Sequence, residues 1–124
     1  MITLEDIHKP VTAELEAFDD FVERQFTAEG ELLSDMLRYA LSTRGKGIRP
    51  MLVMLSAAMN APVKGASMGR RACLAAMLVE MIHVASLIHD DVIDESDMRR
   101  GKPSANARWQ SHKAVILGDY ILAK

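Results

Sequence analysis

Residues 77–100, MLVEMIHVASLIHDDVIDESDMRR, decide the fold, because a long apolar helical run leads directly into a cluster of carboxylates and then into two arginines. Residues four apart share one face of an α-helix, so Asp90 and Asp94 point the same way, and Asp91 lies about 100° further around the helix. A solvated acidic helix end is the simpler interpretation, but carboxylates at the end of a long helix oppose its dipole. Oxygen ligands without cysteine favour magnesium, manganese or calcium over zinc. The cluster therefore indicates a cation site.

Composition limits the classes of protein to consider. The chain has 124 residues, of which 49% are hydrophobic and 26% charged, as in one globular domain or part of one, here taken as residues 1–124. A formal net charge of -2 gives no reason to expect nucleic acid as a partner. The single cysteine, Cys73, predicts a reducing compartment. The N-terminus lacks a leader pattern, and no apolar run approaches the length that spans a bilayer, so we predict a cytoplasmic protein without stable membrane insertion.

Hydrophobic periodicity predicts an all-α, antiparallel helical bundle. An amphipathic helix is expected over residues 4–26, with Thr3 as its N-cap and a kink at Pro10, and a second helix over residues 31–42. A helix over residues 50–59 is apolar nearly all round and should be buried. After a connection over residues 63–67, the long central helix runs to about Asp94. A polar, cationic loop over residues 95–104 and two helices, one capped by Ser104 and one over residues 112–124, complete the chain.

Two basic segments accompany the acidic helix end. Residues 43–50, TRGKGIRP, place Lys46 and Arg49 among glycines that let a backbone approach an anion, although such a turn is by itself often only a solvated loop. The second segment contains Arg99 and Arg100. Pairing these arginines with the acids as surface salt bridges would contribute only about 0 to 1 kcal/mol each. A metal-bridged polyanionic substrate explains both the acidic and the basic groups.

Four motifs then resemble one family. Gly45-Lys46-x-x-Arg49-Pro50, Glu80-x-x-His83-x-x-Ser86-Leu87-x-x-Asp90-Asp91-x-x-Asp94, Arg99-Arg100-Gly101-x-Pro103-Ser104-x-Asn106 and Gly118-Asp119-Tyr120 are similar to the N-terminal half of a trans-isoprenyl diphosphate (polyprenyl) synthase. The resemblance covers residues 45–123. It implies a helical bundle around a deep cavity, a homodimer, and magnesium-dependent transfer of the prenyl group of an allylic diphosphate to isopentenyl diphosphate.

The resemblance also assigns roles to single residues. It implies that Asp90 and Asp94 ligate Mg²⁺ with Asp91 in support, that Arg99 binds the allylic diphosphate, and that isopentenyl diphosphate is held by Lys46, Arg49, His83 and Arg100. Gly47 departs from the family pattern, which has a second basic residue after the lysine. The family's second aspartate-rich motif belongs to a C-terminal half that this sequence does not contain. The chain is therefore expected to be an incomplete catalyst alone, either a fragment of the enzyme or a non-catalytic subunit of a heteromeric synthase.

Product length is a further expectation. Residues four, five and eight positions before Asp90 are placed on or near its face of the helix, where they would line the cavity that receives the growing chain. They are Ser86, Ala85 and Ile82. In the family, aromatic residues at the first two of these positions stop growth at farnesyl. The small Ser86 and Ala85 therefore predict a longer product.

Other classes of function remain open on the residues alone. His83, His89, Asp90 and Asp94 faintly resemble an HD-type metal phosphohydrolase, and Glu80-x-x-His83 resembles half of a di-iron carboxylate bundle. The first leaves Lys46, Arg49 and Arg99 unexplained, and the second needs another Glu-x-x-His pair. A helical interaction module without activity is the third alternative.

Overall fold

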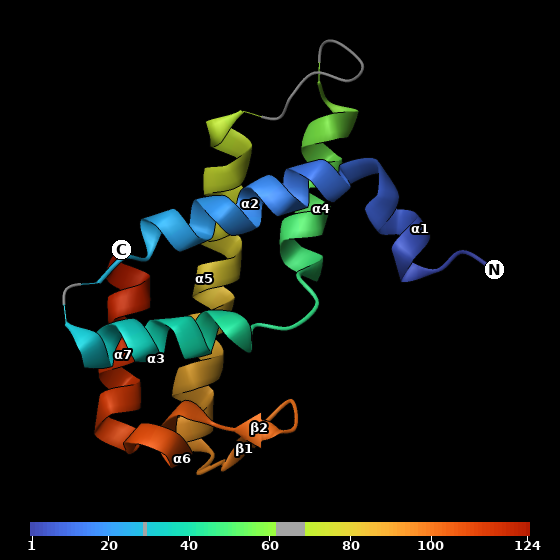
Figure 1. The fold of residues 1–124 in the computed structure, drawn as a ribbon. Helices are drawn as coiled ribbons and strands as arrows, with labels where there is room; N and C mark the ends of the chain where they lie inside the picture. The colour runs from blue at the N-terminus through green and yellow to red at the C-terminus, as the bar shows by residue number, and fades with distance from the viewer. Residues whose placement is uncertain (29, 62–68) are drawn as a thin grey trace. The chain divides into compact units, whose positions relative to one another are not determined.

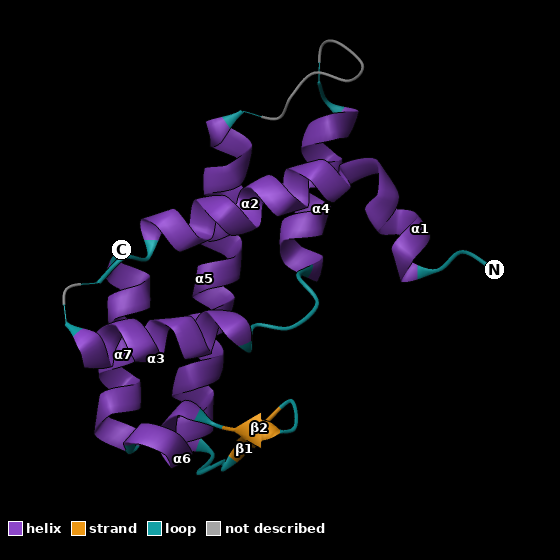
Figure 2. Ribbon diagram, viewed as in Figure 1, coloured by secondary structure: helices purple, strands orange, loops and turns teal. Residues whose placement is uncertain are grey.

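The computed structural model describes residues 1–28, 30–61 and 69–124, so the predicted connection over residues 63–67 lies outside the described residues (Figure 1). The elements in chain order are α1 Leu4–His8, the 3₁₀ helix η1 Lys9–Val11, α2 Thr12–Gln25, α3 Glu31–Ser42, α4 Ile48–Met59, α5 Arg70–Ile93, β1 Met98–Arg99, β2 Lys102–Pro103, α6 Ala105–Trp109 and α7 Ser111–Ala123. The all-α prediction is confirmed, and the β1–β2 hairpin is the exception among the described residues (Figure 2).

These residues form two compact units: the first comprises Met1–Gln25 and Gly47–Glu80, and the second comprises Phe26–Lys46 and Met81–Lys124. The long helix α5 contributes its N-terminal part to the first unit and its acidic end to the second. The assignment of residues 1–124 to one part of a single domain stays a prediction.

The first unit begins with the helix that periodicity predicted. Thr3 caps α1 in a capping box with Asp6, and Pro10 converts the next turn to the 3₁₀ helix η1 before α2 continues. A proline inside a helix removes one backbone donor and clashes with the preceding turn, which explains the interruption. The buried side chains Phe18 and Val22 of α2 belong to the face that packs against α4.

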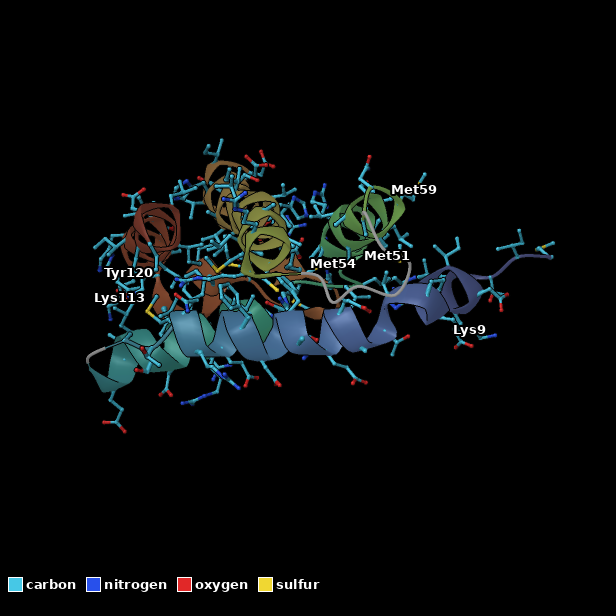
Figure 3. All side chains as sticks on the ribbon, turned by 90° about the horizontal axis from the view of Figure 1, so that it is seen from above. Lys9, Met51, Met54, Met59, Lys113 and Tyr120 are labelled. Atoms are coloured by element: carbon cyan, nitrogen blue, oxygen red, sulfur yellow. The ribbon has the colours of Figure 1, made fainter. Side chains whose placement is uncertain are left out.

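Helix α4 is less buried than its composition predicted. It begins at Ile48, two residues before the expected start, and Figure 3 shows three of its methionines along it. Met51 and Met54 are buried, but Met59 is 86% exposed and Leu52 is 55% exposed. The prediction of a helix buried on nearly all sides is therefore wrong, and an apolar face of α4 lies uncovered.

The second unit positions the acidic end of α5. Helix α7 packs against α6 and against α3. The core of the second unit contains Leu37 of α3, Val84 of α5, and Leu117 and Ile121 of α7. The bounds predicted for α3 agree with the structure, and Ser104 caps α6 by accepting a hydrogen bond from the Ala107 N–H, as expected.

One composition argument needs correction. Helix α5 has 24 residues and a mean hydropathy of 1.8 in its most apolar window, which makes it long and apolar enough to cross a membrane by length and composition. The prediction that no apolar run approaches this length is wrong. The finding is weak evidence for a membrane span, because the core helix of a soluble protein passes the same test.

Candidate functional site

Asp90 and Asp94 form the exposed edge of the site. Both carboxylates are exposed on one side of α5, which we call its open side. Within residues 1–28, 30–61 and 69–124, neither side chain has a hydrogen bond or an ion pair. The peptide N–H of Asp94 donates to the Asp90 carbonyl over 2.8 Å, so the helical turn that places them on one face is intact. Two unpaired carboxylates on one face can act as oxygen ligands of a hard cation.

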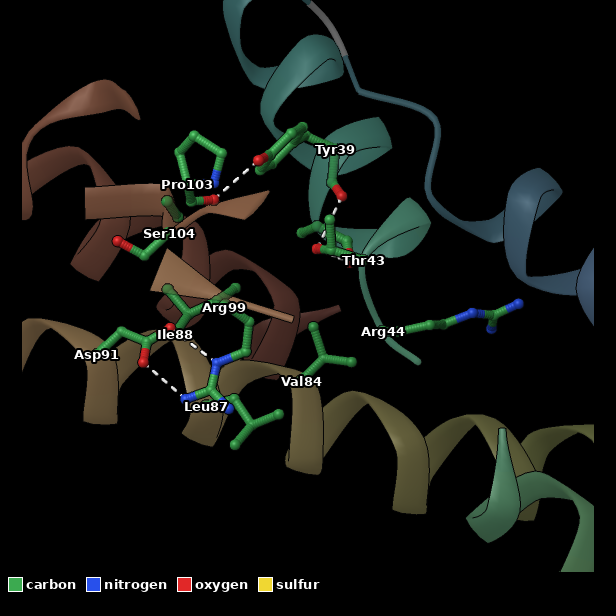
Figure 4. Close-up of a pocket in the computed structure, with 12 residues that line it drawn as sticks. Tyr39, Thr43, Arg44, Val84, Leu87, Ile88, Asp91, Arg99, Pro103 and Ser104 are labelled. Atoms are coloured by element: carbon green, nitrogen blue, oxygen red, sulfur yellow. Dashed lines mark hydrogen bonds and ion pairs between the residues drawn. The ribbon is translucent and has the colours of Figure 1, made fainter. Parts of the chain in front are cut away.

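Asp91 faces the other way and holds Arg99. The Arg99 Nε donates to Asp91 Oδ2 over 3.0 Å, and Arg99 Nη2 donates to Oδ1 over 2.6 Å (Figure 4). The Asp91 side chain is 7% exposed and that of Arg99 is 32% exposed. The hydrogen bonds to Asp91 raise the pKa of the Arg99 guanidinium, and the charges of Asp91, Asp90 and Asp94 raise it further against the effect of burial. Arg99 is therefore a fixed cation beside the exposed carboxylates.

The β1–β2 hairpin carries Arg99 back to the helix, where a polar loop was expected. Arg99 pairs with Lys102 across an antiparallel register, and the two residues between them, Arg100 and Gly101, have φ of 51° and 76°. Positive φ at both central residues is typical of a type I′ turn, whose twist suits a two-residue hairpin. The Arg-Gly pair was the available signal, although arginine is an unusual residue at the first position.

Polar contacts from neighbouring elements fix the hairpin. Ser104 Oγ and Asn106 Nδ2 both donate to the Ser96 carbonyl, over 2.6 and 3.0 Å, and the Tyr39 hydroxyl of α3 donates to the Pro103 carbonyl over 2.8 Å. No sequence motif had singled out Tyr39 or Ser96.

The same tyrosine belongs to an aromatic cluster that joins α3 to α6. The Tyr39 and Trp109 rings meet edge to face at 5.2 Å between centroids. The Arg108 guanidinium lies 4.4 Å from the centre of the Tyr39 ring and 4.6 Å from that of Trp109. Cation–π contacts of this kind contribute roughly 0.5 to 2 kcal/mol each. The cluster therefore anchors α3, which contacts the hairpin through the Tyr39 hydroxyl.

The structure brings some of the predicted basic residues together. Gly45 has φ of 94°, and a Cβ built there would overlap the Arg100 guanidinium, so the loop that carries Lys46 passes directly beside the hairpin turn. Lys46 and Arg100 are both exposed. His83 is half-buried on α5, two turns before Asp90, whereas Arg49 lies in the first turn of α4 and belongs to the first unit.

A small cavity lies between α3, α5 and the hairpin. Its volume is about 40 Å³, and its lining includes Tyr39, Arg44, Asp91 and Arg99 (Figure 4). That volume holds a few water molecules at roughly 10–15 Å³ each and is far below the 300–1,000 Å³ that is usual for ligand pockets. The cavity is therefore not a substrate pocket.

The three residues expected to set product length do not share one face. Ser86 is exposed, with its hydroxyl donating to the His83 carbonyl over 2.8 Å, and Ile82 is 51% exposed, so both lie on the open side with Asp90. Ala85 is fully buried. The placement of Ala85 near the Asp90 face is therefore wrong. Its side chain packs into the core.

The described residues contain no cluster of three or more His, Cys, Asp or Glu side chains that could hold a metal ion. The ligand sets of an HD-type phosphohydrolase and of a di-iron bundle are therefore not assembled in this part of the chain. A cation at Asp90 and Asp94 would need further oxygen ligands from a substrate or from water.

Comparison with known proteins identifies the family. The family model described as "Polyprenyl synthetase" matches residues 30–124. The chain belongs to the polyprenyl synthetase family. This family membership confirms the resemblance read from the four motifs, and it extends the match upstream to include α3.

Individual relatives agree. The chain is 35% identical over 120 residues to the all-trans-nonaprenyl-diphosphate synthase (geranyl-diphosphate specific) of Rhodobacter capsulatus, which covers 97% of this chain and 36% of that protein. It is 36% identical over 123 residues to the octaprenyl diphosphate synthase of Escherichia coli strain K12, which covers 99% of this chain and 36% of that protein. Both relatives are named for long prenyl products.

A solved structure supports the fold. The Caulobacter crescentus CB15 polyprenyl synthase, crystallised with calcium and isoprenyl diphosphate, superposes with a TM-score of 0.84 at 26% identity, over 98% of this chain and 35% of that one. The chain thus spans about a third of the length of these polyprenyl synthetases, rather than the half expected from the motifs.

Proposed function

We propose that this chain supplies the first aspartate-rich site of a magnesium-dependent trans-polyprenyl diphosphate synthase, which joins an allylic diphosphate to isopentenyl diphosphate. The observation that carries the proposal is that the neighbouring carboxylates at the end of α5 have different contacts. In the described part of the chain, Asp90 and Asp94 are exposed and unpaired, while Asp91 holds Arg99 beside them by two hydrogen bonds. Because the chain spans 36% of its relatives' length, we propose that it is an incomplete catalyst alone.

The carboxylates fit magnesium. Mg²⁺ usually binds through one or two carboxylates together with substrate phosphates and water, rather than through a dedicated cage of protein ligands. Asp90 and Asp94 supply that number, and no described group adds a third. When bound, magnesium would neutralise the diphosphate oxygens and stabilise the charge that develops as the carbon–oxygen bond breaks.

The basic residues would orient the two diphosphates. A guanidinium has five N–H donors, and Arg99 uses two of them on Asp91, so about three remain for the allylic diphosphate. Lys46 and Arg100, whose loop and turn lie side by side at Gly45, would hold isopentenyl diphosphate together with His83. As the carbon–oxygen bond of the allylic diphosphate breaks and diphosphate leaves, the double bond of isopentenyl diphosphate attacks the allylic carbon, and loss of a proton from the isopentenyl unit restores a double bond. The reaction therefore needs no nucleophile from the protein.

Thermal unfolding tests the proposal. Magnesium with geranyl diphosphate, an allylic diphosphate, at about 100 times its Kd should stabilise the chain by about 2.7 kcal/mol, or roughly 10 °C in melting temperature. Asp90→Ala should abolish the shift. Asp97→Ala removes an exposed carboxylate beyond the end of α5 and serves as the matched control that keeps the shift. An equal shift in Asp90→Ala, or the same shift with calcium and no diphosphate, would refute the proposal.

We also propose a product longer than farnesyl, now on the basis of Ser86 alone. Ser86 lies one helical turn from Asp90 on the open side of α5, and its small side chain leaves that path unobstructed. In the complete synthase, Ser86→Phe should shorten the product as measured by chain-length analysis. Ala85→Phe places the same ring in the core and should instead destabilise the fold by about 1–3 kcal/mol. An unchanged product in Ser86→Phe would refute this assignment.

We further propose a cytoplasmic homodimer. Leu52 and Met59 leave an apolar face on α4 that a second copy could cover, and Cys73 is a free thiol, as a reducing compartment allows. Sedimentation at increasing protein concentration should show a dimer, and Leu52→Glu should shift it to monomer. A monomer at every concentration would contradict the dimer.

A further inference from the structure

The junction between α5 and α7 is formed around His89, the residue that precedes Asp90. Its Nε2 lies 3.2 Å from the Val115 carbonyl and 3.5 Å from Asp119 Oδ1. Both partners are acceptors, so Nε2 carries a proton and donates. The His89 side chain is 27% exposed, and its ring is therefore mostly enclosed.

Gly118 makes room for this ring. A Cβ built at Gly118 would overlap His89, with the ring Cδ2 only 2.6 Å away, so no other residue fits at position 118 while His89 keeps its place. The imidazole thus occupies a notch that the absent side chain leaves on α7. Gly118 is buried, and its neighbours Leu117 and Ile121 belong to the core.

From this fit we infer that His89 is a positioning residue for the metal and diphosphate site. A helix rotates by about 100° per residue, so the direction of Asp90 follows from the direction of the residue before it. With His89 fixed in the Gly118 notch and bonded to Val115, the last turn of α5 cannot rotate without losing both contacts. Groups behind metal ligands commonly affect affinity by about 10- to 100-fold. The inference rests on the proposed function, because it concerns the same site.

Two amide substitutions test the inference. The amide nitrogen of Gln reaches approximately the position of Nε2, whereas that of Asn ends near Nδ1 and cannot reach the Val115 carbonyl. Calorimetric titration with magnesium and geranyl diphosphate, below the melting temperature and at one fixed pH for all variants, gives the Kd of each variant. We expect His89→Asn to weaken binding about tenfold and His89→Gln to stay within about twofold of the unmodified chain. His112→Asn, at an exposed histidine of α7, is the matched control and should bind normally.

The outcomes separate the two proposals. If the unmodified chain and Asp90→Ala both fail to bind, the proposed function is refuted and the role of His89 with it. If Asp90→Ala alone abolishes binding and His89→Asn binds as tightly as the unmodified chain, only the inference is overturned. The inference is likewise overturned if His89→Asn and His89→Gln weaken binding equally, or if neither folds by circular dichroism, since His89 would then serve folding rather than positioning.

Discussion

The Asp91–Arg99 pair offers the sharpest test of how the acidic helix end is organised, through the substitution Asp91→Asn. The change removes the negative charge and turns one of two acceptors into a donor that faces a guanidinium. Breaking a buried charge pair costs about 3–5 kcal/mol. Arg99 is 32% exposed and can turn partly towards water, so screening reduces the expected loss to about 2 kcal/mol. For a chain of this size, that loss corresponds to roughly 8 °C in melting temperature.

Asp90→Asn is the matched control, because it makes the same chemical change one residue earlier on an exposed side chain without a hydrogen-bonded partner in the described part of the chain. It should alter the unfolding free energy by less than about 0.5 kcal/mol. Urea unfolding without metal can be followed by fluorescence of the chain's one tryptophan, Trp109, which contacts Tyr39 in the same unit.

The ligand response should show the opposite pattern. Asp90→Asn should lose the stabilisation by magnesium and geranyl diphosphate, whereas Asp91→Asn should keep a metal response but bind the diphosphate more weakly, because Arg99 is no longer fixed. If both variants lose equal stability, or if Asp91→Asn unfolds within about 0.5 kcal/mol of the unmodified chain, the assignment of Asp91 as the anchor of Arg99 would be refuted.

Two further perturbations test local features. Gly45→Ala should destabilise the fold by about 1–2 kcal/mol because of its left-handed φ, and it should also displace Arg100. Gly47→Ala should carry only the φ penalty, because no described atom lies within 4 Å of its Cβ position. If both variants lost equal stability and equal affinity for isopentenyl diphosphate, the Arg100 contact would be contradicted. The backbone hydrogen bond from Thr3, with the side-chain contacts of Lys9 and Thr3, lowers the pKa of Asp6 from 3.8 to about 2. Because the folded pKa lies below the unfolded one, this stabilisation is present above about pH 4 and is lost as the pH falls through about 2, and an NMR titration midpoint near 3.8 would contradict the capping box.

Periodicity predicted the helices well where each one has an uncovered polar face and a clear boundary. The bounds of α3 agree with those expected, because a strong leucine stripe lies between Gly30 and the break before Gly45. Composition predicted α4 less well. An apolar side chain indicates that burial of its face would be favourable, but it does not show whether another element covers that face. Leu52 and Met59 were therefore expected to be buried and are exposed.

The sequence predicted which residues form the candidate site better than it predicted how they pair. Helical spacing alone put Asp90 and Asp94 on one face, and the structure agrees. The pairing of Asp91 with Arg99 depends on a hairpin whose strands have two residues each, too short to show an alternating pattern. Ala85 was misplaced for a simpler reason, since five residues on a helix correspond to about 140° of rotation away from Asp90.

The consecutive residues His89, Asp90 and Asp91 show how this helix end is held by its neighbours. At about 100° per residue they point in three directions, and the structure uses each one differently. His89 enters the notch on α7, Asp91 bonds the hairpin through Arg99, and Asp90 is left on the open side between them. Two neighbours fixed by separate elements set the orientation of the third without any contact to its carboxylate. A ligand that binds Asp90 therefore meets a carboxylate that is already oriented and that, within the described residues, has no hydrogen bond or ion pair.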